Sequence, residues 1–424
     1  MNLTENDSRS WIKRIDFLFV HFFFLSSIGL VFSLLEGIDL FPLNEKLLQW
    51  DTGWYDNIRQ FGYQYSDIEQ SNSGFYPLFP HVWKWTGLSV FGITLVNMTC
   101  SLTGLYLLYR NLSFGKMEML VALSLPSMFF LFVPYTESFF FLFGSIFLVG
   151  LHNGNKNWIW AGIFLASLTR PTAVFYVPAL VCVVLLSSKT SELRLDKIMK
   201  DALFYLSPIV SGLLVVVLWQ WLETGVWFAY FKAQSAHWYR GISIPNFPLS
   251  TWNYTKILWL DALAFLVGSL AFGMILKKLI AWLKGNLVVE NKAIVFSTAY
   301  IAVVFLSLIL FNPKNQTSGL TEISGANRYV FVSPFFFVLI LNYLRSEGLP
   351  LIVLLATPLI WFLFNVYDEM YLLPFAQLTI YAVSFLLLPR LNRLRSPVTI
   401  VLYLVGMVLQ LYVFSMFIRG EWVG

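Results

Sequence analysis

Residues 293–311 of the chain read AIVFSTAYIAVVFLSLILF. The run contains no charged side chain, and as a helix it is long enough to cross the roughly 30 Å hydrocarbon core of a bilayer. Comparable apolar runs recur along the 424 residues, of which 58% are hydrophobic and 12% charged, and the mean hydropathy is +0.70. Because so few charges cannot cover a water-exposed surface, the sequence predicts an all-α polytopic membrane protein.

Hydropathy predicts about thirteen transmembrane helices. They lie near residues 15–36, 87–109, 117–134, 137–151, 158–170, 171–187, 202–222, 256–276, 292–311, 329–344, 349–366, 373–389 and 397–418. If the N-terminus is cytosolic, most of the 28 Lys and Arg residues fall in inside segments, as the positive-inside rule expects. The first span is long for a signal-peptide core and no cleavage site follows it, so we expect it to remain as an anchor.

Polar residues gather on the opposite, outer face. The first outer loop, residues 37–86, carries Asp51, Asp56 and His81, and its amphipathic pieces predict short interfacial helices. Four further segments bring candidates to this face: Glu137 in the turn between the third and fourth spans, Arg170 at the end of the fifth, His237, Trp238 and Arg240 in the loop near 223–254, and Arg328 with Tyr329 at the end of the loop that begins at 312. Carboxylates, arginines and histidines from five segments thus share one membrane face.

Each of these residues also has an ordinary structural explanation. An interfacial aspartate such as Asp51 can cap a helix, and Asp56 lies off the helical face of Asp51 and can cap or face water. Glu137 precedes an apolar run and needs a partner or a place at the mouth of the span. Arg170 and Arg328 can extend to the headgroups, yet the planar guanidinium also suits phosphate recognition. A lone histidine is most often an ordinary interfacial side chain.

Several signatures of other sites are missing from the sequence. No histidine or carboxylate set has metal-ligand spacing, and no glycine-rich phosphate loop or basic patch for nucleic acid occurs. Asp51-Thr52-Gly53 lacks the second aspartate of a nucleotide-sugar Asp-x-Asp motif. Cys100 and Cys182 both fall inside apolar runs, where a thiol acts as a small apolar group. The sequence therefore predicts neither a metal nor a cofactor.

Several blocks resemble the GPI mannosyltransferase 2 family and its prokaryotic relatives, within the GT-C class of integral membrane glycosyltransferases. The blocks are Trp50-Asp51, Gly62-Tyr63, Phe75-Tyr76-Pro77-Leu78-Phe79-Pro80, Pro134-Tyr135-Thr136-Glu137-Ser138, Thr169-Arg170, His237-Trp238 and Asn327-Arg328-Tyr329. They run in order over residues 50–335. The chain departs from the pattern at Pro171-Thr172, where eukaryotic members tend to carry a Ser-Asn-Gly-like sequence.

The resemblance implies a GT-C-like bundle in residues 1–344, followed by helices of unknown role in residues 345–424. It implies transfer of a sugar, with mannose the first choice, from a polyprenyl-phosphate donor to a glycan or glycolipid acceptor on the extracytosolic face. Asp51 takes the position of the catalytic base, and Glu137 would orient it or the acceptor. The residues left for binding the donor phosphate and the substrates are Arg170, Arg328, His237, Arg240, Asp56, Tyr63, Tyr76, His81, Trp238 and Tyr329.

Two other classes of protein fit a polar face on a membrane bundle. A transporter or flippase of a lipid-linked sugar would also carry charges among its helices, but more often near mid-membrane. A lipid-linked glycan ligase or polymerase would share the face and the donor type. The short loops favour a prokaryotic cytoplasmic membrane, with the endoplasmic reticulum as the alternative, and the sequence names no protein partner.

Overall fold

The computed structural model describes His21, Ser26 and residues 43–187, 194–237, 241–251, 260–286, 291–311, 319–364 and 372–423. Within these ranges the chain is helical and forms no β-strand, apart from two isolated bridges. The α-helices are α2 (Leu43–Lys46), α3 (Asp51–Phe61), α4 (Leu78–Thr86), α5 (Val90–Asn111), α6 (Lys116–Leu123), α7 (Glu137–Asn153), α8 (Lys156–Thr169), α9 (Tyr176–Leu186), α10 (Leu195–Thr224), α11 (Ala229–His237), α12 (Leu260–Leu283), α13 (Lys292–Leu310), α14 (Ala326–Phe331), α15 (Pro334–Leu344), α16 (Leu351–Ala356), α17 (Leu372–Leu387) and α18 (Arg395–Ile418).

Short 3₁₀ helices connect several of these elements. They are η1 (Asn72–Gly74), η2 (Pro126–Leu131), η3 (Pro171–Phe175), η5 (Thr357–Leu363), η6 (Leu388–Arg390) and η7 (Asn392–Leu394). The prediction of an all-α membrane protein is confirmed. Residues 43–86 form short helices rather than a long span, as their amphipathic pattern predicts.

Among the described residues, five helices are long and apolar enough to cross a membrane: α5, α10, α12, α13 and α18. Four further apolar helical stretches of 10–17 residues lie at Glu137–Asn153, Pro171–Leu186, Pro334–Leu344 and Leu351–Leu363. The predicted count of about thirteen spans is therefore wrong over this part of the chain. The first predicted span, residues 15–36, lies outside the described residues except for His21 and Ser26.

The predicted number of spans is too high because a hydropathy average over a window of residues does not detect where a helix breaks. In the predicted span 117–134, α6 ends at Leu123 and a separate 3₁₀ helix begins at Pro126. In the span 349–366, α16 ends at Ala356 and the chain continues as the 3₁₀ helix η5. Proline lacks an N–H and disfavours helical geometry in the residue before it, so an apolar run that contains proline need not be one helix.

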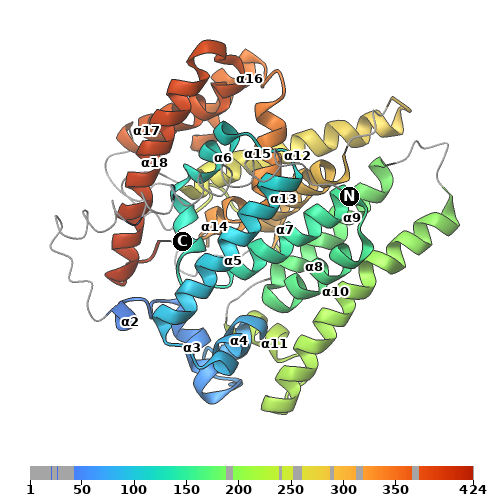
Figure 1. Ribbon diagram of the computed structural model, residues 1–424, viewed down its shortest axis with the longest axis vertical. Coiled ribbons are helices and arrows are strands. Elements are labelled where there is room, and N and C mark those ends of the chain that lie inside the picture. Colours follow the sequence, from blue (N-terminus) through green and yellow to red (C-terminus); the bar gives the residue numbers. More distant parts are fainter. Residues whose placement is uncertain are drawn as a thin grey trace, which may run out of the picture.

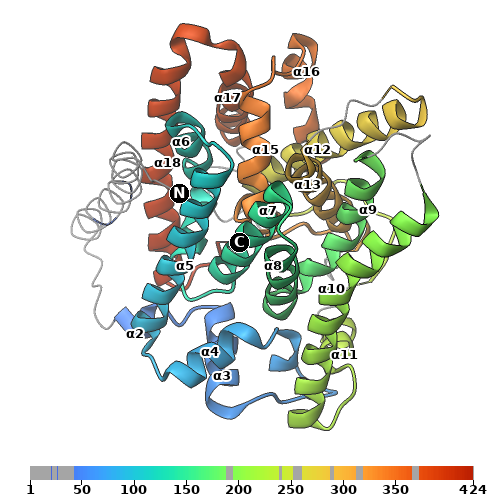
Figure 2. The ribbon, with the colours of Figure 1, turned by 45° about the vertical axis from the view of Figure 1, so that its right-hand side comes forward.

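The helices are distributed over two ends and a middle region of the molecule. Helices α2, α3, α4 and α11 lie at the lower end of the view and α16 and α17 at the upper end, with α5, α7, α8 and α13 between them (Figures 1 and 2). Helices α7 and α8 approach closely because glycines face the contact. A Cβ on Gly162 would lie 2.6 Å from the backbone nitrogen of Phe147. Small residues at such contacts are typical of helices packed within a membrane.

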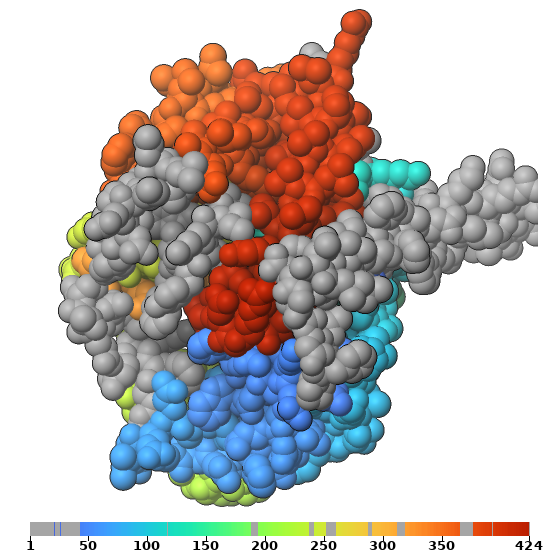
Figure 3. Space-filling model, turned by 90° about the vertical axis from the view of Figure 1, so that its left-hand side faces the viewer, coloured from blue at the N-terminus to red at the C-terminus, as the bar shows by residue number. Residues whose placement is uncertain are grey.

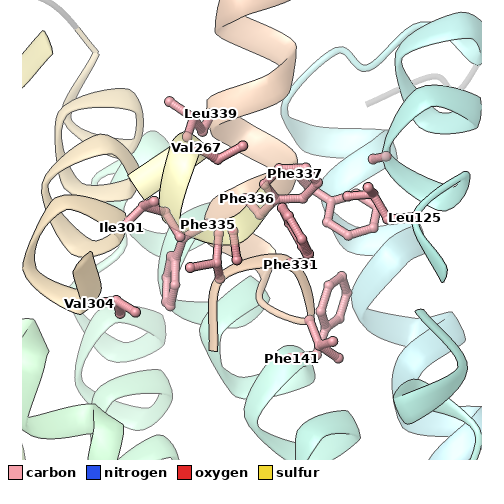
Figure 4. Packing of buried hydrophobic residues seen from close by; sticks show 14 of the residues in the cluster. Leu125, Phe141, Val267, Ile301, Val304, Phe331, Phe335, Phe336, Phe337 and Leu339 are labelled. Carbon is pink, nitrogen blue, oxygen red and sulfur yellow. The ribbon is translucent and has the colours of Figure 1, made fainter. Parts of the chain in front are cut away.

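Helix α15 lies at the centre of the apolar core (Figure 4). It begins at the cap Ser333, whose Oγ accepts the N–H of Phe336. Its three consecutive phenylalanines contact three different helices: the ring of Phe335 lies 4.3 Å from that of Tyr300 in α13, Phe336 lies 5.1 Å from Phe331 in α14, and Phe337 lies 5.2 Å from Phe141 in α7. The core thereby fixes α7 and α14, which carry two charged candidate residues.

Candidate active site

Four charged residues meet at the ends of helices from distant parts of the chain. Asp51 and Glu137 are the first residues of α3 and α7, Arg170 directly follows α8, and Arg328 lies in α14. A carboxylate is favoured in the first turn of a helix because the N-terminal end of the helix dipole is positive. The fold therefore brings together the two carboxylates and two arginines that the sequence placed on one face.

The four side chains form one ion-paired cluster. Oε1 of Glu137 accepts from Nη1 of Arg170 at 2.7 Å and from Nη2 and Nε of Arg328 at 2.7 and 2.8 Å. Nη2 of Arg328 also donates to Oδ2 of Asp51 at 2.8 Å. Burial lowers the pKa of Arg328, but Glu137 and Asp51 more than offset this and hold the pKa well above its usual value. Two negative and two positive charges thus balance.

The carboxylates of Glu137 and Asp51 differ in their exposure to solvent. The side chain of Glu137 is completely buried, whereas that of Asp51 is 21% exposed. Glu137 is engaged by both arginines, while Asp51 contacts one of them at the edge of the cluster. Asp51 is therefore the carboxylate that a bound molecule can reach.

Aromatic rings pack against the guanidinium groups of Arg170 and Arg328. Arg328 lies over the rings of Phe130 and Tyr135, at 4.9 and 4.7 Å from their centroids, and Arg170 lies 5.3 Å from the ring centroid of Tyr329. Such cation–π contacts stabilise a desolvated guanidinium. The two cations are consequently fixed in position rather than free to extend to the membrane surface.

The cluster borders a polar cavity of about 150 Å³. Among the residues that line it are Asp51, Tyr55, Arg170, Arg328, Tyr329 and Trp422, whereas Glu137 lies behind the arginines. Tyr55 Oη lies 3.3 Å from Oγ1 of Thr136, and burial raises the pKa of Tyr55, which keeps its hydroxyl protonated.

A larger cavity of about 430 Å³ adjoins the polar one. The two share Tyr76, Tyr230 and Tyr329, so these tyrosines stand at the boundary. The surface of the larger cavity is mainly apolar, with Phe175 and Phe311 among its lining residues, although Ser235, Ser307 and Glu322 also line it. A charged chamber therefore lies beside a larger and more apolar one.

Asp261, in the first turn of α12, fixes the segment that carries Arg328. Oδ1 of Asp261 accepts from the backbone N–H and from Nδ2 of Asn327, at 2.9 and 2.7 Å, and Oδ2 accepts from the N–H of Gly325 at 3.3 Å. Ser127 donates to Oδ1 of Asn327 at 2.8 Å. The sequence interpretation missed Asp261, although a carboxylate inside the predicted span 256–276 is a signal of a functional or structural role.

Tyr63 and His81, two predicted site residues, belong to a different cluster around Glu223 at the end of α10. The carboxylate of Glu223 accepts from the backbone N–H of Tyr63 at 2.6 Å and from Nε1 of Trp219 at 2.9 Å, and it lies 3.4 Å from Nε2 of His81. The hydroxyl of Tyr63 donates to the carbonyl of Phe75 at 3.0 Å. These residues do not line the polar cavity. They fasten residues 63–81 to α10.

The remaining predicted residues fall into three groups. Tyr76 and Tyr329 line the polar cavity. Asp56 does not line it and instead accepts from Arg59 at 2.7 Å and from Gln60 at 2.6 Å on its own helix. His237 is the last residue of α11. The structure does not describe the side chain of His237 or any part of Trp238 and Arg240.

Comparisons with protein-family models, with curated proteins and with solved structures find no match to this chain. Within the ranges that the structure describes, no group of three or more His, Cys, Asp or Glu side chains is arranged to hold a metal ion. The chemistry of the site follows from its own residues: an accessible carboxylate and two fixed guanidinium groups face one cavity, with an apolar chamber next to it.

Proposed function

We propose that this protein is an inverting glycosyltransferase that moves a sugar, with mannose as the first choice, from a polyprenyl-phosphate donor to a hydroxyl of a glycan or glycolipid. The transfer takes place on the extracytosolic face of a prokaryotic cytoplasmic membrane, or of the endoplasmic reticulum in a eukaryote. One observation carries the proposal: the accessible carboxylate of Asp51 shares a cavity with the guanidinium groups of Arg170 and Arg328.

The proposed reaction needs a base and a stabilised leaving group. Asp51 accepts the proton of the acceptor hydroxyl while the acceptor oxygen forms a bond to the anomeric carbon of the donor sugar. The bond from that carbon to the phosphate oxygen breaks, and the phosphate leaves with the electron pair. Arg170 and Arg328 offset the charge that develops on the phosphate, and the planar guanidinium suits two of its oxygens.

The ion pair between Asp51 and Arg328 implies that the donor phosphate binds before Asp51 acts as the base. Before substrates bind, Asp51 accepts a hydrogen bond from Arg328 at 2.8 Å, which occupies the carboxylate. A donor phosphate that takes this hydrogen bond from Arg328 leaves Asp51 free to accept the proton of the acceptor hydroxyl. Glu137 holds both arginines in place throughout and need not touch the substrates.

The adjoining apolar cavity supports a lipid-linked donor. The phosphate of such a donor sits between a sugar and a hydrocarbon chain, so its site needs a polar and an apolar chamber that meet. The tyrosines shared by the two cavities mark this meeting point.

The position of the charges favours an enzyme over a flippase. Transporter sites lie near mid-membrane at interrupted helices, where charges from two repeats meet. Here Asp51 begins the 11-residue helix α3, which is too short to cross a membrane, and the other charges lie at the ends of α7 and α8 and in the six-residue helix α14. This arrangement suits chemistry near one interface.

A transfer assay with the purified protein in nanodiscs tests the proposal. The labelled donor is polyprenyl-phosphate mannose, the acceptors are lipid-extracted glycans, and nucleotide-linked mannose serves as the matched negative donor. We expect the lipid donor to be consumed and a mannosylated product to appear. Movement of intact donor between proteoliposome leaflets without a new product would replace the enzyme with a flippase, and addition of a whole glycan would indicate a ligase or polymerase.

A further inference from the structure

The segment that follows α18 turns back onto the first described segment of the chain. Gly420 has a φ of +82°, and its N–H donates to the carbonyl of Phe417 at 2.9 Å. The next N–H, of Glu421, donates to the carbonyl of Met416 at 3.0 Å, so a tight turn ends the helix. Figure 3 shows the dark red end of this region directly above the blue segment that contains α2 and α3.

The returning segment contacts the residue that precedes Asp51. Nε1 of Trp50 donates to the carbonyl of Glu421 at 3.1 Å, and the indole rings of Trp50 and Trp422 lie 5.0 Å apart, edge to face. Trp50 has a φ of +51°, which is rare for a bulky residue and costs free energy unless its surroundings hold it. The contact therefore holds the backbone that leads into Asp51.

Trp422 itself lines the polar cavity, together with Asp51, Arg170 and Arg328. Its ring is half-buried, and the edge-to-face contact with Trp50 limits its rotation. The wall thus combines a wide aromatic surface with a carboxylate and two cations. At about 150 Å³ the cavity is smaller than the roughly 300–1,000 Å³ of pockets for drug-sized ligands, which leaves room for a single ring.

These features match the surface of a sugar. A pyranose presents apolar C–H groups on a ring face and hydroxyl groups around the rim. The C–H groups pack on the electron-rich face of an indole, and the hydroxyl groups hydrogen-bond to charged side chains. An aromatic ring fixed beside a carboxylate provides both kinds of contact at once.

We propose that Trp422 is a substrate-contacting residue on which the ring of a sugar packs. This inference rests on the proposed glycosyltransferase function and assigns a role to the region after residue 344. The sugar belongs either to the donor or to the acceptor, because both rings meet at the bond that forms. The helices of residues 345–424 then supply part of the site rather than only a membrane anchor.

The test compares Trp422→Ala and Trp422→Phe with Trp227→Ala as the matched control. Trp227 does not line either cavity, is about half exposed, and also contacts a second tryptophan, Trp221, at 4.5 Å. We expect Trp422→Ala to raise KM about tenfold or more for one substrate, with a smaller change in kcat, and Trp422→Phe to stay within about threefold of the wild type. Trp227→Ala should match the wild type.

The two KM values identify which sugar is bound. A rise in the donor KM assigns the ring to the donor, and a rise in the acceptor KM assigns it to the acceptor. Unchanged KM values, or a fall in kcat alone, would overturn the inference, because Trp422 would then act only through Trp50 and Asp51. The function would stand in that case, since the wild type would still transfer sugar.

Saturation-transfer NMR with methyl α-mannoside provides a readout that does not depend on turnover. Binding that is lost in Trp422→Ala and kept in Trp422→Phe supports the sugar contact even if the wild type proves inactive, which would defeat the proposed reaction alone. Equal binding to the wild type and Trp422→Ala would count against the contact.

Discussion

Glu137 is the residue on which the charge balance of the site depends. It is fully buried and pairs with both arginines, so its removal would leave two guanidinium groups with Asp51 as their remaining carboxylate. Breaking a buried ion pair from one side typically costs about 3–5 kcal/mol, because the partner keeps its charge without compensation.

Glu137→Gln should therefore lower the free energy of unfolding by about 3–5 kcal/mol, and Glu137→Gln combined with Arg170→Gln should recover part of the loss, because the charges balance again. Unfolding in mixed micelles measures both changes. Asp196→Asn is the control: its ion pair with Arg194 is exposed, so its loss should cost no more than about 1 kcal/mol. A double variant that is less stable than the sum of its parts would contradict the charge-balance argument.

The sequence singled out Asp51, Glu137, Arg170 and Arg328 because isolated charges beside apolar runs are expensive and need a reason. It could not show which carboxylate is accessible, since that depends on the packing of α7, α8 and α14. Trp422 escaped notice because one of 16 tryptophans carries no signal by itself. The family resemblance predicts Tyr63 as a site residue, and His81 is a candidate because it lies in the same loop as Asp51, but both contact Glu223 instead.

The segment that follows α3, residues 62–81, depends on its attachment to α10. Helix α3 ends at Phe61, and the capping residue Gly62 has a φ of +76°. The backbone N–H of the next residue, Tyr63, donates a hydrogen bond to the carboxylate of Glu223. A Cβ at Gly62 would lie 2.9 Å from Oε2 of Glu223. An alanine here meets both an unfavourable backbone conformation and a close contact.

Gly62→Ala should destabilise the protein by more than about 1 kcal/mol and increase protease cleavage within residues 64–71. Gly53→Ala is the matched control within the same helix. No atom lies within 4 Å of a Cβ at Gly53, whose φ is negative, so this change should stabilise α3 by about 0.5–1 kcal/mol. If Gly62→Ala and Gly53→Ala changed the free energy of unfolding and the protease cleavage equally, the attachment to α10 would not be what stabilises this segment.

Helices were predictable from hydropathy, but the positions where they break were not. The runs 117–134 and 349–366 are predominantly apolar, and each contains a proline near the break. Whether proline ends a helix or only bends it depends on the neighbours: α10 continues through Pro208, and α6 and η2 are separate. The residues that pack around each proline come from distant parts of the chain, so the local sequence does not show whether the helix breaks there.

The proposed function places the two ends of the molecule on opposite sides of the membrane. Helices α3 and α4 lie at one end of the molecule, and α16 and α17 lie at the other (Figure 1). The proposed topology places Asp51 on the extracytosolic side and Arg110, Lys156 and Arg345 on the cytosolic side, as the positive-inside rule expects. The proposed reaction requires the cavity to open on the extracytosolic side.

A membrane-impermeant thiol reagent tests this orientation in a variant without Cys100 and Cys182. A cysteine at the exposed Gln70 should react in intact cells, and one at the exposed Lys156 only after permeabilisation. The reverse pattern would place the cavity on the cytosolic side and remove the extracytosolic reaction.

The most direct measurement compares the turnover of Asp51→Asn with that of Asp56→Asn in nanodiscs with the lipid-linked donor. Asparagine keeps the shape of the side chain but cannot accept the proton, so Asp51→Asn should reduce kcat by about 10²–10⁴, with unchanged folding and a donor KM within a few-fold of the wild type. Asp56 is five residues away on the same helix and outside the cavity, so Asp56→Asn should retain near-normal turnover. Near-normal transfer by Asp51→Asn would contradict the assignment of Asp51 as the base and, with it, the proposed mechanism.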